Sequence, residues 1–381
     1  MIIFFSIVLI IHLSVNYFIY RHSKVIFDIS GWIGISLKTL FIVMVLTYPV
    51  GRILERLYPS IMSDLIVKIG SFWLGAMLYL FLLFLLFDIA KLLHAGTGFP
   101  AFLSAKNNPL FLRKVVLGTY LVVSTILIAG YFNALYPTVN SIRIKSNKNV
   151  NSHNLLRIGA ASDIHLGTLI ANGHLERFVS MMNKQNPDII LLAGDIFDED
   201  LGPVIKKDMG SVLSKLSAPL GVYAVTGNHE YIGGVEAAVK YLEEHGVRVL
   251  RDTSIVINNS FNIVGREDRQ SKMMGNFERK TLSKLTANIN KELFTILLDH
   301  QPYKLNEAVE NDIDLQISGH THHGQMFPFN LITSSMFEVS RGYKKIENTH
   351  VYVSTGFGTW GPPIRIGNRP ELVVIEVETN K

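Results

Sequence analysis

The chain has 381 residues, a formal net charge of +5 and no cysteine. This length allows two domains, and the lack of cysteine excludes disulfides, cysteine-ligated zinc and a thiol nucleophile. The basic residues are spread along the sequence, so the charge indicates a modest attraction to anionic lipid headgroups rather than nucleic-acid binding. Long apolar runs lie almost entirely before Tyr136, whereas the composition after Asn151 is that of an ordinary globular domain.

The first part of the chain predicts an all-α membrane domain over residues 1–140. A helix needs about 20 apolar residues to cross the hydrocarbon core, and residues 2–20, 31–50, 69–92 and 115–135 are each long enough. Four such runs in succession disfavour buried helices of a soluble protein. The first run has no basic region before it and no small-residue cleavage site after it, so we expect an uncleaved span rather than a signal peptide.

Basic residues beside these runs indicate an orientation for a multi-pass protein in the cell membrane. The loops after the first and third runs contain Arg21, Lys24, Lys91, Lys106, Arg113 and Lys114. The opposite side contains Arg52, Arg56, Arg143, Lys145 and Lys148, with Lys68 at the margin. The positive-inside rule therefore places the second domain outside the cytoplasm, by a narrow difference in count. Residues 141–154 are polar and predict a short linker.

Residues 155–381 predict a layered α/β domain. Short apolar runs typical of strands lie at residues 156–161, 189–193, 222–226, 294–298, 315–318, 351–354 and 372–377. Segments with helical periodicity lie at residues 174–184, 204–216 and 235–244, and residues 255–257 with 261–264 indicate a hairpin. This alternation favours a mixed sheet, or two sheets packed face to face, over a purely parallel sheet.

Residues of metal-ligating type follow five of these strands. The segments are Asp163-Ile164-His165, Gly194-Asp195, Gly227-Asn228-His229-Glu230, Asp299-His300 and Gly319-His320-Thr321-His322. The carboxyl ends of strands in α/β sheets are where ligand sites form, and carboxylate with imidazole suits manganese, iron or zinc. Each segment alone is common, since a lone strand histidine is more often a core residue. The ordered set of five predicts a site for divalent metal ions.

This ordered set resembles the calcineurin-like metallophosphoesterase superfamily, from about Leu155 to Val377, and the anchored arrangement is similar to its bacterial membrane-bound branch. The resemblance implies two divalent metal ions. One would be held by Asp163, His165, Asp195 and His322. The other would be held by Asp195, Asn228, His300 and His320, with Asp195 as the bridge.

The resemblance also implies roles for residues beside these ligands. His229 is expected to protonate the leaving oxygen or to bind the phosphoryl group, and Glu230 and Asp299 to orient ligand imidazoles, unless they are surface carboxylates. His323 stands where the branch commonly has glycine, and we expect it to be solvated rather than in contact with substrate. The run from Gly194 to Asp200 lacks the arginine that protein phosphatases of the superfamily use, which disfavours that activity.

The expected function is hydrolysis of a phosphate ester or pyrophosphate at the bilayer surface. A lipid-linked or other phosphorylated small molecule is the expected substrate, and a UDP-acyl-sugar-type pyrophosphate is one candidate by family analogy. The alternative is a membrane sensor or scaffold whose phosphoesterase fold is idle, although none of the seven expected ligands is missing. A nuclease would need a basic stripe with interleaved aromatic residues, and the sequence has none, so we expect no nucleic-acid partner.

Overall fold

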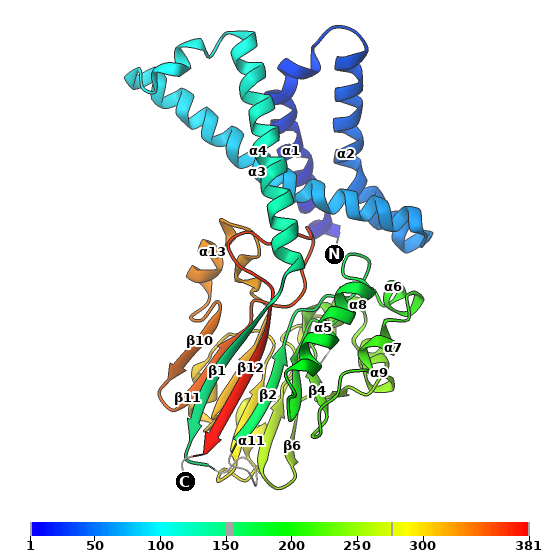
Figure 1. The fold of residues 1–381 in the computed structure, drawn as a ribbon, viewed down its shortest axis with the longest axis vertical. Coiled ribbons are helices and arrows are strands. Elements are labelled where there is room, and N and C mark those ends of the chain that lie inside the picture. Colours follow the sequence, from blue (N-terminus) through cyan, green and yellow to red (C-terminus); the bar gives the residue numbers. More distant parts are fainter. Residues whose placement is uncertain (1, 149–154, 276, 380–381) are drawn as a thin grey trace. The chain divides into compact units, whose positions relative to one another are not determined.

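The computed structural model describes residues 2–148, 155–275 and 277–379 (Figure 1). The chain divides into two compact units. The first, here called the helical unit, is Met1–Phe132 with Gly361–Ile364, and the second, the α/β unit, is Asn133–Trp360 with Arg365–Lys381. The boundary therefore falls inside the last long helix, a few residues before the position 140 that we expected.

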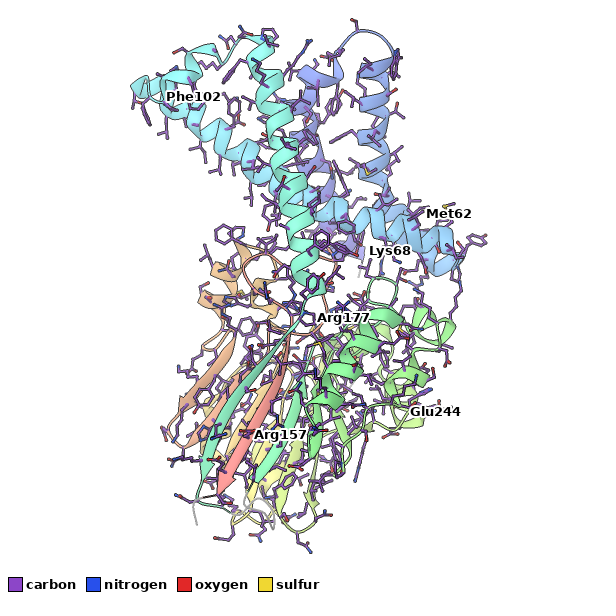
Figure 2. All side chains as sticks on the ribbon, viewed as in Figure 1. Met62, Lys68, Phe102, Arg157, Arg177 and Glu244 are labelled. Carbon is purple, nitrogen blue, oxygen red and sulfur yellow. The ribbon has the colours of Figure 1, made fainter. Side chains whose placement is uncertain are left out.

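The helical unit contains four long helices and a short 3₁₀ helix. They are α1 (Ile2–Phe27), α2 (Trp32–Leu57), α3 (Ile61–Thr97), η1 (Ala101–Ala105) and α4 (Pro109–Leu135). Within the described residues, α2, α3 and α4 are long and apolar enough to cross a membrane. The structure thus gives three candidate spans where the sequence predicted four. Exposed apolar side chains such as Met62 on α3 are consistent with a lipid-facing surface (Figure 2).

Polar residues of α1 make contacts inside the helical unit. His12 and Asn16 lie in the middle of the helix, and both are buried. The Asn16 amide donates to the carbonyl oxygen of His12 at 2.8 Å, and Trp73 Nε1 of α3 donates to Asn16 Oδ1 at 3.1 Å. Polar side chains inside a membrane protein face the bundle interior in this way. The contacts place the polar stripe of α1 against α3.

The α/β unit is built on two six-stranded mixed sheets. The first has the order β1 (Thr138–Ser146), β12 (Glu371–Thr379), β2 (Leu155–Ala161), β3 (Ile189–Ala193), β4 (Val222–Val225) and β5 (Arg248–Val249). The second has the order β10 (Gly342–Ile346), β11 (Thr349–Val353), β9 (Leu315–Ser318), β8 (Phe294–Leu298), β7 (Phe261–Gly265) and β6 (Thr253–Ile257). Strands β2 to β5 are parallel, as are β7, β8, β9 and β11. This confirms the predicted mixed α/β architecture.

One hydrophobic core lies between the two sheets and another beneath the helices. The first joins residues such as Ile158 and Leu191 of the first sheet to Ile263 and Ile296 of the second. The other packs α5 (Asn172–Lys184), α7 (Met209–Leu213) and α9 (Val235–Glu244) on the outer face of the first sheet (Figure 1). The remaining helices are α6 (Gly202–Lys206), α8 (Asn228–Gly233), α10 (Ser271–Met274), α11 (Leu282–Thr286), α12 (Asn306–Glu310), η2 (His322–Gly324) and α13 (Phe329–Met336).

Two local expectations differ from the structure. Residues 141–146 of the expected linker belong to β1, which pairs with β12 and places Ile142 opposite Ile375; residues 149–154 lie outside the described part. The alternation of Ile142 and Ile144 with polar residues is the strand signal, because Ile144 is buried and its neighbours are not. The helix expected at 204–216 is two helices, because Asp208 adopts a left-handed φ of 48° between them.

Candidate metal centre

Five strands of the α/β unit deliver all seven expected ligand residues to one place. The segments that carry them follow β2, β3 and β4 of the first sheet and β8 and β9 of the second. His165 and His322 are 157 residues apart in the sequence, yet their Nε2 atoms are only 2.9 Å apart. The two sheets therefore meet at this edge, and the expected site is a spatial cluster.

The first group consists of Asp163, His165 and His322, whose ligand-type atoms all lie within 4.8 Å of one another. His165 Nε2 faces His322 Nε2, and His322 Nε2 lies 3.5 Å from Asp163 Oδ1. All three residues are buried. Borderline divalent metals prefer such a donor set, in which two imidazole nitrogens and a carboxylate oxygen converge at a buried site. The group therefore fits a metal ion.

The second group consists of Asp195, His300 and His320, again within 4.8 Å of one another. His300 Nε2 lies 3.1 Å from Asp195 Oδ2, and Asn228 Oδ1 lies 2.8 Å from His320 Nδ1. His300 Nδ1 is 2.7 Å from the carbonyl oxygen of Ala193, which accepts its proton. With its proton on Nδ1, a neutral His300 ring would present Nε2, the atom opposite the Asp195 carboxylate, to a metal, which is the usual arrangement of ligand histidines.

The two groups adjoin through Asp195. A third group within 4.8 Å joins Asp195 to His165 and His229, so the Asp195 carboxylate lies within reach of both sides. Burial alone would raise the pKa of Asp195, but the positive charges of His300 and His229 outweigh it and hold that pKa well below the usual value. Asp195 is thus a carboxylate at neutral pH, as a bridging ligand must be.

The backbone at this centre is strained. Five of the seven expected ligands have left-handed φ angles, a conformation that costs about 1 kcal/mol or more for each residue other than glycine. These residues are Asp163, His165, Asp195, His320 and His322. Two glycines make room for them, since a Cβ on Gly227 would meet Asp195 and a Cβ on Gly319 would meet Asp163. Such strain persists at functional sites, where it presents side chains that regular strands cannot.

The two carboxylates expected to orient imidazoles make other contacts. Glu230 is 1% exposed and accepts the backbone N–H groups of Gly227 at 2.7 Å, Phe197 at 2.9 Å and Asp195 at 3.0 Å. Asp299 is also buried and accepts from Arg266 and Arg279. Neither is a surface carboxylate. Glu230 thus positions the ligand loops by binding their backbone N–H groups. The sequence did not predict this role, because it suggested imidazole rings as the partners of Glu230.

His229 lies beside the centre without being one of the seven expected ligands. Its ring centroid is 4.6 Å from that of His165 and 5.9 Å from that of Trp360, and its Nδ1 lies 3.5 Å from Asp198 Oδ1. Burial lowers the pKa of His229, but the charges of Asp195 and Asp198 outweigh it and raise that pKa to about 9. A protonated imidazole next to the ligand cluster is suited to proton donation.

His323 is buried and not solvated, contrary to expectation. Its Nδ1 lies 3.0 Å from Ser340 Oγ, and its backbone φ is 44°. The side chain therefore points into the protein, towards Ser340. Because Asn368 Nδ2 donates to the carbonyl oxygens of both His322 and His323, at 2.9 and 3.1 Å, this part of the loop is fixed by hydrogen bonds.

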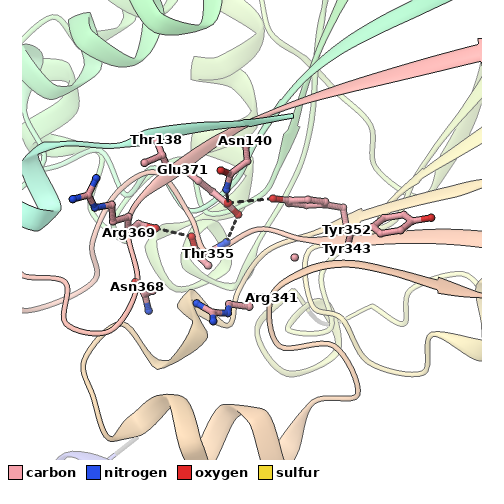
Figure 3. Close-up of a pocket in the computed structure, with 10 residues that line it drawn as sticks. Thr138, Asn140, Arg341, Tyr343, Tyr352, Thr355, Asn368, Arg369 and Glu371 are labelled. Atoms are coloured by element: carbon pink, nitrogen blue, oxygen red, sulfur yellow. Dashed lines mark hydrogen bonds between the residues drawn. The ribbon is translucent and has the colours of Figure 1, made fainter. Parts of the chain in front are cut away.

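A polar cavity of about 410 Å³ adjoins this loop (Figure 3). Asn368 lines it, and the buried Glu371 accepts from the backbone N–H of Thr355 at 2.8 Å and from the Tyr352 hydroxyl at 3.1 Å. Arg369 also lines the cavity. The cavity thus shares Asn368 with the support of His322. Its buried carboxylate, Glu371, connects the start of β12 to the loop after β11.

Comparisons with known proteins agree with this geometry. Residues 156–324 match the profile of the family described as calcineurin-like phosphoesterase. An uncharacterized metallophosphoesterase of Campylobacter jejuni is 30% identical over 100% of this chain and 99% of its own length. One of Aquifex aeolicus is 33% identical over 58% of this chain and 85% of its own.

A vertebrate relative also contains a membrane part. The transmembrane protein with metallophosphoesterase domain of Danio rerio is 32% identical over 78% of this chain and 70% of its own length. The fold and the ligand clusters define a metal-dependent phosphoesterase domain in a membrane-associated protein. The chain belongs to the calcineurin-like phosphoesterase family, and this membership implies divalent metal ions and a phosphorylated substrate.

Proposed function

We propose that the protein is a multi-pass membrane phosphoesterase that hydrolyses a phosphate ester or pyrophosphate with two divalent metal ions. The observation that carries the proposal is the convergence of the seven ligand-type residues on one buried edge. One ion would be held by Asp163, His165, Asp195 and His322. The other would be held by Asp195, Asn228, His300 and His320.

Each residue of the centre has a chemical task in this proposal. Two bound divalent ions would supply an activated water and neutralise charge on the phosphoryl oxygens. Asp195, ionised at neutral pH, joins the two ligand groups, and His229 donates a proton to the leaving oxygen. Glu230 keeps the loops after β3 and β4 in register through three backbone N–H groups. Burial of the ligands Asp163, His165, Asp195, His300 and His322 lowers the local dielectric and so strengthens the electrostatic contacts among them.

A lipid-linked substrate is the class that the architecture supports best. Helix α4 ends at Leu135 and β1 begins at Thr138, so Tyr136 and Pro137 alone separate a candidate span from the first strand of the α/β unit. Extended residues reach about 3.5 Å each. The start of β1 therefore lies within about 10 Å of the end of α4, a candidate span, and phosphates of membrane lipids are abundant at the end of such a span. A UDP-acyl-sugar-type pyrophosphate is one such substrate, and manganese, iron and zinc all suit the ligands.

The test uses the full chain in lipid nanodiscs, stripped of metal and reloaded separately with manganese, iron or zinc. Hydrolysis of a phosphomonoester, a phosphodiester, a nucleotide pyrophosphate and a lipid-linked pyrophosphate is then measured, with bound metal counted by mass spectrometry. Turnover that requires metal, and is fastest with the lipid-linked compound, supports the proposal. Two tightly bound ions with no turnover of any compound would identify the alternative, an idle sensor or scaffold.

A further inference from the structure

Helix α13 presents an apolar surface to solvent although it belongs to the α/β unit. None of its residues is buried. Phe329, Leu331, Ile332 and Met336 are 39%, 61%, 52% and 61% exposed. Phe329, Ile332 and Met336 follow the i, i+3, i+7 spacing, so they form one stripe along the helix, and Leu331 lies beside it. We call these four residues the α13 surface.

The α13 surface also lacks the charges that a solvated helix normally carries. From Gly324 to Phe337 the sequence contains no Asp, Glu, Lys or Arg. A helix of a globular protein normally turns its apolar stripe to the core and its polar face to water, and contiguous exposed apolar patches mark a binding surface. The α13 surface therefore fits a partner whose own surface is apolar.

The α13 surface is fixed to the metal centre at both ends of its segment. Before the helix, Gly324 packs so closely on the backbone of Phe329 and Asn330 that a Cβ on it would clash. After the helix, the Thr321 hydroxyl donates to the carbonyl oxygen of Ser340 at 2.6 Å. The hydroxyl oxygen of Ser340 lies 3.0 Å from His323 Nδ1. The loop of His320 and His322 is thus clamped to α13.

A further exposed aromatic side chain belongs to a residue that is hydrogen-bonded to the segment leading into α13. Trp360 is 55% exposed, and its ring is 5.9 Å from that of His229. Its backbone N–H donates to Gln325 Oε1, and the Gln325 amide donates back to the Trp360 carbonyl oxygen, both at 2.8 Å. Tryptophan is typical of the membrane–water interface, where one end of the ring is apolar and the other polar.

We propose that the α13 surface inserts into the boundary between headgroups and acyl chains of the bilayer, and so holds the metal centre at the depth of lipid phosphates. The bilayer is the partner we choose because β1 of this unit begins only two residues after α4, which is a candidate span. An apolar helix face buries about 5–10 Å into that boundary. The delivery of a lipid-linked phosphate to the centre rests on the proposed function, whereas the insertion itself does not.

The native chain has no cysteine, so single cysteines can be labelled at one site each. Leu331→Cys and Ile332→Cys, carrying an environment-sensitive fluorophore, are placed in nanodiscs with the full chain. Met273→Cys and Ile205→Cys are the matched controls, because Met273 and Ile205 are apolar residues of the same unit that are 80% and 58% exposed. The expected result is that lipids with a nitroxide on the acyl chain quench the labels at 331 and 332 but not the controls, while aqueous iodide does the reverse.

Two quenching results would overturn the insertion. Labels at 331 and 332 that iodide quenches as strongly as the controls would leave the surface in water. Labels in nanodiscs that neither iodide nor the lipid nitroxide quenches would show that protein, such as a second copy of the chain, covers it. Lipid quenching without phosphoesterase turnover would keep the insertion and reject the proposed function. Turnover of a lipid-linked phosphate without lipid quenching would reject the insertion alone.

Discussion

Arg365 Nη2 lies 3.1 Å from Nδ1 of His322, and both side chains are buried. A guanidinium only donates hydrogen bonds, so Nδ1 is the acceptor and the proton of a neutral His322 ring lies on Nε2, which faces His165 Nε2. Binding a metal through Nε2 therefore displaces a proton. Burial lowers the pKa of Arg365 to about 10, which leaves it charged at neutral pH.

Arg365→Lys should weaken metal binding while preserving the charge. The guanidinium also donates to the carbonyl oxygen of Thr355 at 2.7 Å and to Asn368 Oδ1 at 3.0 Å, and an ammonium does not reproduce this fork. We expect metal affinity to fall by about 10–100-fold, the usual effect of losing a residue that supports a ligand. Calorimetric metal titration measures this loss. Arg157→Lys, at a partly exposed ion pair with Glu376, is the control and should bind normally.

The shared carboxylate is tested by Asp195→Asn. Its Oδ1 accepts from the backbone N–H of His229 at 2.9 Å, and its Oδ2 lies 3.1 Å from His300 Nε2. The amide is isosteric but neutral, so we expect loss of at least one ion and hydrolysis at background, with the circular dichroism spectrum unchanged. Normal turnover with two bound ions would contradict the role of Asp195 as a bridge.

The sequence predicted the ligand cluster because strand ends of an α/β domain share an edge. Asp163 and His320 could be placed together from their positions after apolar runs, without knowing any long-range contact. The supporting residues could not, because their partners are set by tertiary structure alone. Glu230 binds backbone N–H groups of another loop, and Arg365 reaches His322 from 43 positions away. The exposure of the apolar face of α13 could not be predicted either, because periodicity indicates an apolar stripe but not whether another part of the protein covers it.

Stability should depend on pH through Glu307, which accepts from Arg266 Nη1 at 2.9 Å. Burial raises the pKa of Glu307, but Arg266 outweighs it and holds the pKa below its usual value. Because the pKa of Glu307 is lower in the folded state, its ionised form stabilises the fold fully at pH values above the unfolded-state pKa of about 4.3. This stabilisation is lost as the pH falls through the pKa of the folded state. Because the pair is partly exposed, Glu307→Gln should cost about 1 kcal/mol at pH 7. Thermal unfolding should show the variant and wild type converging below about pH 4; a constant difference would contradict the ion pair.

The side of the membrane can be read from one labelled position. Glu244 is exposed at the end of α9 in the α/β unit (Figure 2). With no native cysteine, Glu244→Cys gives a single reactive thiol. The distribution of basic residues predicts that a membrane-impermeant maleimide labels this thiol in intact cells. Labelling only after lysis would place the unit in the cytoplasm and leave the chemistry of the centre unchanged.

His229→Ala separates proton donation from metal binding. His229 adjoins Asn228 in the turn after β4, yet its ring faces Trp360 and Asp198 while Asn228 Oδ1 faces His320 and His300. If His229 protonates the leaving oxygen, the variant keeps both ions and loses about 10²–10⁴-fold in rate. The loss should be smaller for p-nitrophenyl phosphate, whose leaving group departs without protonation, than for an alkyl phosphate. His245→Ala, which removes a partly buried imidazole bonded to the Tyr241 carbonyl oxygen away from the centre, is the control. The number of bound ions and the rates on both esters distinguish the possible roles of His229. A lost ion would make His229 a ligand, consistent with its grouping beside His165 and Asp195. Equal losses of rate on both esters would assign His229 to phosphoryl binding.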